Sequence, residues 1–152
     1  FIFKKNLFVL MQSIIEDLKI NPRFLGSFLG QNLKYVEGHV KPADAFDYNI
    51  LYAMFKFLNK KKIKVDLAKL MIPIVYEHPK MDFESVLELI NYKKVSAENI
   101  YSHILFLKEK FAEIGIRKEA EKECNWIMGE LRSVAIGNID LSDLAKRIKE
   151  AN

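Results

Sequence analysis

The sequence predicts an all-α fold made of two small helical units with about eight helices. Apolar residues recur every three or four positions along most of the chain, which is the spacing of one face of an α-helix. Only six glycines and four prolines interrupt the 152 residues, so residues that form turns are scarce. No run longer than about four residues alternates apolar and polar side chains as a half-buried strand does. Because 50% of the residues are apolar, the chain can bury a core.

The first predicted helix runs from residue 7 to residue 18, with apolar side chains at helical spacing. Asn21 and Pro22 then supply an N-cap and a proline for the first turn of a second helix, which ends near Gly38. Residues 39–46 are expected to connect the two parts of the chain.

The main domain boundary is therefore predicted in this connection, between an N-terminal helical segment over residues 1–40 and a second domain over residues 47–152. Pro73 is expected to kink its helix or to end it early. The remaining predicted helices are Tyr48 to Asn59, Val65 to Glu77, Phe83 to Ile90, Ala97 to Ile114, Arg117 to Val134 and Leu141 to Glu150, with Asp47, Asp82, Ser96 and Asp140 as N-caps.

Catalytic and metal chemistry find little support in the sequence. The single cysteine, Cys124, has no Cys or His at metal-binding spacing and favours neither a disulfide scaffold nor a zinc site, so we expect a cytoplasmic location. The three histidines lie in separate predicted elements, and no glycine-rich phosphate loop occurs. We therefore expect a protein that is not an enzyme and that needs no cofactor or metal.

The sequence predicts neither a transmembrane segment nor a signal peptide. The longest apolar runs, 7–10 and 72–76, are far shorter than the roughly 20 residues that span a bilayer, so no transmembrane segment is expected. Phe1 stands where a start methionine would, and the first residues lack the apolar core of a signal peptide. We interpret the chain as a fragment of a longer protein.

Two groups of cations are candidate RNA-binding sites. A net charge of +4 permits attraction to phosphates, although the 20 acidic residues are interspersed with the 24 basic ones. Each group also has a simpler interpretation as a solvated helix connector or a solvated helix face. The candidate residues are Lys60, Lys61 and Lys62 in the first group, and Arg117, Lys118, Lys122 and Arg132 in the second.

Two residues of the predicted helix from Arg117 to Val134 are given structural roles. Trp126, the only tryptophan, shares its helix with apolar side chains and is expected to anchor the packing. Gly129 lies in mid-helix, where glycine costs about 1 kcal/mol relative to alanine, so we expect it to permit a close helix crossing.

The C-terminal third combines a charged lead-in, a tryptophan, a mid-helix glycine, a short turn and a closing amphipathic helix. These parts lie at Lys118 to Arg132, at Gly137-Asn138 and at Leu141 to Lys149. Their order resembles the end of the YqeY-like domain that closes subunits B and E of the tRNA-dependent amidotransferases, the GatB/GatE family. Asn21 to Gly30 resembles the entry of the helical segment that precedes this domain in the family.

The resemblance implies an accessory role in the conversion of mischarged glutamyl-tRNA into glutaminyl-tRNA. The chain would be the tail of such a subunit, with the domain over 47–152 YqeY-like, and it would position tRNA-Gln by backbone and shape contacts. Its partners would be tRNA and the other amidotransferase subunits, and neither DNA nor a membrane. The catalytic cradle domain of the family has no counterpart in these 152 residues, so no catalytic residue is expected.

A helical protein interaction module without RNA binding is the alternative interpretation. In that case an apolar face left by incomplete helical packing would dock onto a partner subunit.

Overall fold

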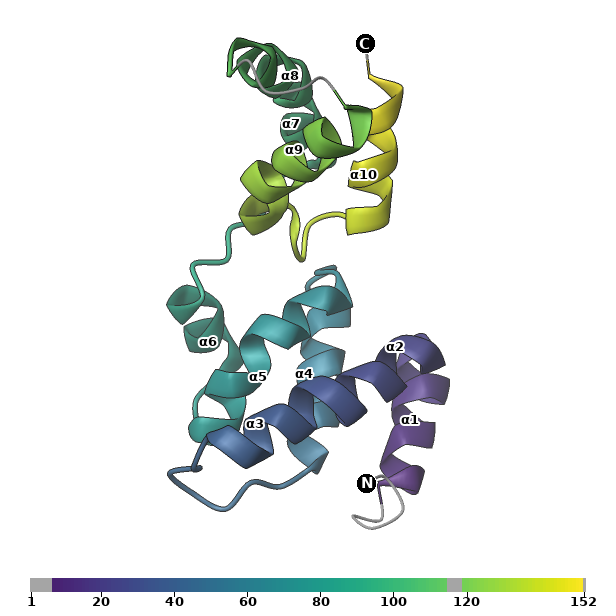
Figure 1. The fold of residues 1–152 in the computed structure, drawn as a ribbon. Helices are drawn as coiled ribbons and strands as arrows, with labels where there is room; N and C mark the ends of the chain where they lie inside the picture. The colour runs from purple at the N-terminus through teal and green to yellow at the C-terminus, as the bar shows by residue number, and fades with distance from the viewer. Residues whose placement is uncertain (1–6, 115–118, 152) are drawn as a thin grey trace. The chain divides into compact units, whose positions relative to one another are not determined.

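The computed structural model describes residues 7–114 and 119–151. Within these ranges the chain is entirely helical apart from turns and connections, which confirms the predicted fold class (Figure 1). Several segments join end to end, since α2, η1 and α3 form one continuous stretch and η2 leads directly into α5. The segments are α1 Phe8–Leu18, α2 Pro22–Ser27, the π-helical η1 Phe28–Leu33, α3 Lys34–His39, α4 Asn49–Lys60, the 3₁₀ turn η2 Val65–Leu67, α5 Ala68–Glu77, α6 Phe83–Leu89, α7 Ala97–Ser102, α8 Ile104–Glu113, α9 Ala120–Ala135 and α10 Leu141–Glu150.

The chain divides into two compact units, unit 1 up to Asn91 and unit 2 from Tyr92 onward. The boundary predicted between residues 40 and 47 is therefore misplaced, because the segments on its two sides share one core. Helix α1 packs against α4, and α3 packs against α5. The connection itself is tied down, since the Ala43 amide donates to the carbonyl oxygen of Glu77 over 2.8 Å.

Unit 1 is organised around aromatic side chains. Phe28 and Phe55 are both fully buried, and their rings meet edge to face with centroids 5.3 Å apart. Phe24 completes the cluster, with its ring 6.1 Å from that of Phe28. This geometry is the favoured one for aromatic pairs, so the cluster adds specific contacts to the burial of a large apolar area.

The helix over residues 22–39 contains a π-helical turn in its middle. Asn21 caps its start as predicted, since its side-chain oxygen accepts from the amides of Arg23 and Phe24. In a π-helical segment each amide reaches back five residues instead of four. Phe28, Leu29 and Leu33 of this segment are all buried.

Unit 2 is built on the helices α9 and α10, which pack against each other, and α7 and α8 pack against α9. Ile127, Ala135 and Leu144 are fully buried in its core, which is largely aliphatic. The turn between α9 and α10 contains Gly137, whose φ of 86° favours glycine. The next residue, Asn138, connects two segments of the unit through side-chain hydrogen bonds.

The side-chain amide of Asn138 makes four hydrogen bonds. Its oxygen accepts from the Tyr92 hydroxyl at 2.9 Å and from the Val95 amide at 3.1 Å. Its nitrogen donates to the carbonyl oxygens of Lys93 and Val134, at 2.9 and 2.8 Å. All its donors and acceptors are thereby used, so Asn138 fixes the first residues of unit 2 to the α9–α10 turn.

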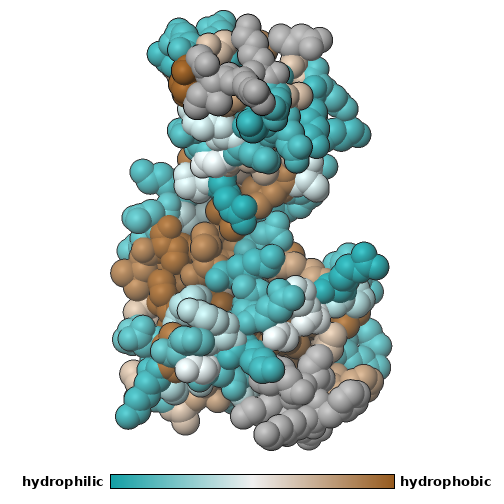
Figure 2. Space-filling model, in the orientation of Figure 1, coloured by the Kyte–Doolittle hydropathy of each residue, from teal (hydrophilic) through white to brown (hydrophobic). Residues whose placement is uncertain are grey.

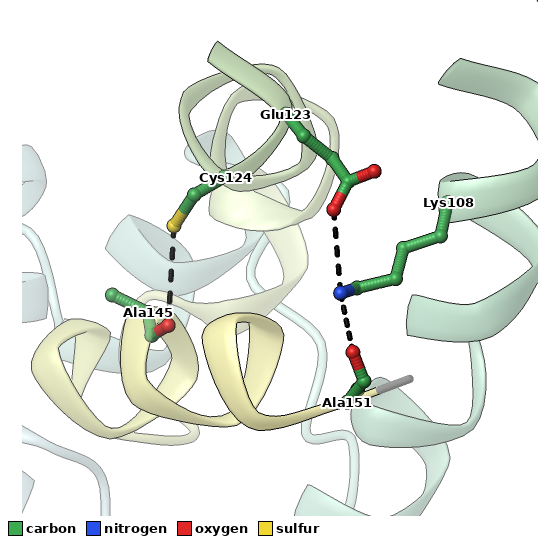
Figure 3. A network of polar contacts seen from close by, with 5 residues as sticks. All are labelled: Lys108, Glu123, Cys124, Ala145 and Ala151. Atoms are coloured by element: carbon green, nitrogen blue, oxygen red, sulfur yellow. Dashed lines mark hydrogen bonds and ion pairs between the residues drawn. The ribbon is translucent and has the colours of Figure 1, made fainter. Parts of the chain in front are cut away.

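A second tie connects α8 to the other two long elements of unit 2 (Figure 3). The Lys108 ammonium lies 3.3 Å from a Glu123 carboxylate oxygen and also donates to the carbonyl oxygen of Ala151. The Cys124 thiol points toward the Ala145 carbonyl oxygen at 3.9 Å. Lys108 and Glu123 are largely shielded from solvent, so this pair is screened less than an exposed one.

One predicted helix is interrupted, and the early end that Pro73 could have caused in another is not observed. The helix expected from Ala97 to Ile114 is broken at His103 into α7 and α8. The Ser102 hydroxyl, which donates to the Asn99 carbonyl oxygen at 2.6 Å, competes there with the helical hydrogen bonds. By contrast, α5 continues through Pro73 to Glu77.

Candidate nucleic-acid interface

The lysine run at residues 60–62 forms the end of α4. The Lys62 amide donates to the carbonyl of Asn59 at 3.1 Å, and the Ile63 amide donates to that of Leu58 at 2.9 Å. This pair of bonds is a Schellman motif, with Lys62 at the left-handed position, φ 58°. Ile63 and Leu58 are both buried, which supplies the apolar contact that accompanies the motif.

Two of the three lysines are available to a ligand. The Lys61 ammonium lies 2.7 Å from a carboxylate oxygen of Glu84 and 5.9 Å from the ring centroid of Phe57, so its charge is already balanced. Lys60 and Lys62 are exposed and form no ion pair within the described part of the chain. The predicted cluster therefore contributes two free cations.

The end of α1 lies beside the end of α4. The side-chain amide of Asn59 donates to the Leu18 carbonyl oxygen over 2.7 Å, although the two residues are 41 positions apart. Lys19, the next residue, is exposed and left-handed like Lys62, with a φ of 57°. The fold thus brings the segment that follows α1 next to the Lys60–Lys62 run.

A side chain from the start of α5 reaches α2, the helix that follows Lys19. The Lys69 ammonium lies 5.5 Å above the ring of Phe24, and Arg23 is the exposed neighbour of that phenylalanine. We call this surface the basic end of unit 1. It comprises Lys19, Arg23, Lys60, Lys62 and Lys69.

The charge of the basic end is nearly uncompensated. Residues 18–24 and 59–65 contain no acidic side chain. The nearby Asp17 carboxylate accepts from the Tyr52 hydroxyl at 3.2 Å. Because α1 and α4 both end here, their negative dipole ends stabilise adjacent cations without a ligand, and this effect falls off within one turn.

Two cations of the second predicted group, Lys122 and Arg132, lie in the described residues. Lys122 lies 3.5 Å from a carboxylate oxygen of Glu119. Arg132 follows ten residues later, about 15 Å along the same helix. Arg117 and Lys118 lie outside the described residues. No common basic surface on α9 is formed by Lys122 and Arg132.

Gly129 does not serve the close helix crossing that was expected. A Cβ atom built there meets no heavy atom within 4 Å outside its own helix turn, so the prediction of a packing role is wrong. Gly129 instead borders a shallow hollow of about 430 Å³ between α9 and α10, beside Arg132 and Lys149. Trp126 does pack, with its ring 5.8 Å from that of Phe111, against the edge of the unit 2 core.

Titratable groups do not converge on a reaction centre in the described residues, and no three metal-ligating side chains gather there. Cys124 is buried, and the ring of His39 stacks on Tyr35 with centroids 3.9 Å apart. The pKa of Tyr48 is raised by burial and by the hydrogen bond that its hydroxyl donates to Glu37 at 2.9 Å. The chemistry that the described residues support is therefore the binding of anions by the cations of the basic end.

Unit 2 carries a different surface, an apolar groove between the α7–α8 pair and α9. Its volume is about 420 Å³, and it lies at the break at His103. Phe106 and Val134 on its walls are 55% and 41% exposed, so apolar surface is left in water. The apolar lining consists of Val95, Ile100, Phe106, Leu107, Leu131 and Val134.

A further apolar area lies on unit 1. Figure 2 shows hydrophobic residues gathered over α6, where Leu89 is 58% exposed. Among the described residues, no helix combines the length and the apolarity that crossing a membrane requires.

The chain was compared with protein-family models, with curated proteins and with solved structures, and none of these comparisons found a match. The resemblance to the tail of the amidotransferase subunits therefore remains a prediction.

Sequence reasoning missed three cations of the basic end, Lys19, Arg23 and Lys69. The segment that contains Lys19 and Arg23 has two cations, no acid and a predicted helix boundary, which is the same pattern that singled out residues 59–65. That signal was available. Its proximity to the lysine run was not, because it depends on how α1 packs on α4.

Proposed function

We propose that this chain is a noncatalytic RNA-binding tail that contacts the phosphate backbone of tRNA through the basic end of unit 1. The observation that supports this most is the convergence of cations from three separate segments on a surface without acids in its two main segments. The tail of a glutamyl-tRNA amidotransferase subunit, which the C-terminal part of the sequence resembles, is the role that fits such a surface. Amidation would be carried out by other domains, and the other subunits would be the protein partners.

Backbone strain at the same surface also supports the proposal. Lys19 and Lys62 both have positive φ angles, where a residue other than glycine costs roughly 1 kcal/mol or more. Glycine would relieve that cost at both helix ends but would remove the charge. Two strained lysines on one surface are what a requirement for cations would produce.

The mechanism would be electrostatic docking. Each cation that neutralises a phosphate releases a condensed counterion, so affinity falls as salt rises and depends little on base sequence. Contacts of this kind position the RNA, and other domains of a longer protein would act on its acceptor end.

The test is tRNA binding by the 152-residue chain, measured by gel shift at several salt concentrations. The triple variant Arg23→Gln, Lys60→Gln, Lys62→Gln should bind at least about tenfold more weakly, and its salt slope should be smaller by about 2 to 3. The control removes two charges elsewhere on unit 1, Lys41→Gln with Lys80→Gln, where Lys80 lies 3.3 Å from Asp44. An equal loss in both variants, or no salt-dependent binding by the parent chain, would contradict the proposal.

A single substitution separates function from stability. Lys62→Gly should raise the free energy of unfolding by about 0.5 kcal/mol, because glycine accepts the left-handed backbone. The same variant should weaken tRNA binding, because one phosphate contact is lost. A variant that becomes more stable and binds tRNA as before would remove Lys62 from the interface.

The alternative function, a protein interaction module, is favoured by the apolar groove of unit 2. A groove on one unit and cations on the other are compatible in one chain.

A further inference from the structure

We propose that the apolar groove of unit 2 binds a basic amphipathic helix of a partner protein. This interaction goes beyond the proposed RNA binding and uses residues of the other unit. The groove has the composition of a helix-binding site, with apolar walls and a few polar groups at its margin.

The apolar walls are exposed without an evident role in folding. Phe106 projects from α8 and Val134 from α9, on opposite sides of the groove, while Ile100 and Leu131 form its buried floor. Contiguous apolar surface in a groove marks an interaction site more often than a scattered exposed leucine does.

The charges around the groove identify the chemistry of the partner. The only carboxylate in the lining is that of Glu130, which is exposed and forms no ion pair in the described residues. Lys110, which lies 5.4 Å above the Phe106 ring, is 3.7 Å from Glu113 and so is already balanced. Glu130 therefore offers a carboxylate at the groove that a lysine or arginine of the partner would complement.

A second copy of the chain fits this surface less well. A symmetric dimer that packs groove against groove places the same patch on both sides, so two Glu130 carboxylates would enter one interface. Like charges brought together in this way oppose association. A helix with an apolar row and flanking bases buries the walls and pairs with Glu130.

The test measures binding of two designed peptides to the full 152-residue chain by fluorescence anisotropy. Both peptides are helices of about 18 residues with leucine at every third or fourth position, one with lysine and the other with glutamate on the flanks. The lysine peptide should bind at least about tenfold more tightly. Glu130→Lys should reverse this preference, which a merely structural role of Glu130 would not do.

Two further variants locate the site. Val134→Asp places a charge on the groove wall and should weaken binding of the lysine peptide by about tenfold or more. Leu89→Asp, an equivalent change at an exposed leucine of unit 1, should leave it unchanged, and circular dichroism checks that both variants are folded.

The outcomes separate this proposal from the proposed RNA binding. Equal affinity for both peptides, no reversal by Glu130→Lys, or a dimer that Val134→Asp dissociates would overturn the groove proposal while leaving tRNA binding unaffected. Loss of tRNA binding in the Arg23, Lys60 and Lys62 variant, with normal peptide binding, would support the basic end as the tRNA site. It would also show that the groove acts independently of that site.

Discussion

The two units differ in the aromatic side chains at their centres and in the surfaces that they present. Unit 1 buries Phe28 and Phe55 completely and leaves lysines at the end where α1 and α4 meet. Unit 2 has an aliphatic centre and leaves Phe106 55% exposed beside a groove. The same chain thus presents a surface suited to a polyanion on one unit and a surface suited to an apolar helix on the other.

The difference also concerns what holds each unit together. Unit 1 is stabilised by contacts among buried aromatic rings, and the free energy that these contacts contribute grows with the apolar area buried. Unit 2 has smaller core side chains and adds polar ties through Asn138 and Lys108. Substitutions in the two units should therefore have different kinds of consequences.

The largest effect is expected from Phe55→Ala in unit 1. Removing a fully buried ring leaves a cavity, and the free energy of unfolding of unit 1 should fall by about 3 to 5 kcal/mol. Circular dichroism in urea follows both units, whereas fluorescence of Trp126, the only tryptophan, follows unit 2. The control Phe106→Ala should change stability by less than about 0.5 kcal/mol. A coincident shift of both signals for Phe55→Ala would show that the units unfold together.

The next effect is expected from Asn138→Asp in unit 2. A carboxylate cannot donate to the carbonyl oxygens of Lys93 and Val134, so two acceptors lose their partner and face a negative charge. The free energy of unfolding reported by Trp126 should fall by about 2 to 3 kcal/mol. Asn125→Asp, an exposed amide on α9, serves as the control and should have little effect. Equal stability of the two variants would mean that the Asn138 amide does not hold the unit.

Two glycines of unit 2 should respond to alanine with opposite signs. Gly129→Ala should raise the free energy of unfolding by about 0.5 to 1 kcal/mol, because the site is helical and a Cβ has open space. Gly137→Ala should lower it by about 1 kcal/mol or more, because its φ is 86°. Urea denaturation followed by Trp126 fluorescence measures both. A loss of stability in Gly129→Ala would restore the packing role that the sequence suggested.

The smallest effect concerns two helix caps, the ionisable Asp82 of α6 in unit 1 and the neutral Ser96 of α7 in unit 2. Asp82 caps α6, and the hydrogen bonds from the Ser85 amide and hydroxyl lower the pKa of its carboxyl group. Its stabilisation is present above the unfolded-state pKa of about 3.9 and is lost as pH falls through the lower folded pKa. The NMR shift of the Ser85 amide should titrate in this acid range.

Two references check that result. In Asp82→Asn the NMR shift of the Ser85 amide should not change with pH, because the side-chain amide oxygen of the introduced asparagine accepts the hydrogen bond without titrating. The shift of the Asn99 amide, which donates to the Ser96 hydroxyl at 3.2 Å in unit 2, should not change with pH either. A Ser85 signal that titrates equally in Asp82→Asn would assign the change to another group.

The sequence was sufficient for features that depend on neighbouring residues. The N-caps at Asn21, Asp82 and Ser96 are observed where the sequence predicts them, because each bonds an amide two or three residues away. The break at His103 was missed, since the apolar pattern continues across it and a single serine bond gives no periodic signal. Gly129 was misassigned because glycine in a helix does not reveal whether a neighbouring helix is close.

By itself, the sequence determined the helical class, most helix limits and the low frequency of turns, because these follow from periodicity and from contacts within about four residues. Tertiary structure decided the division after Asn91, the basic end of unit 1 and the groove of unit 2. These depend on segments such as Leu18 and Asn59, which are 41 positions apart and meet because α1 packs on α4. Periodicity shows that a helix has an apolar face, whereas only packing determines which other face covers it.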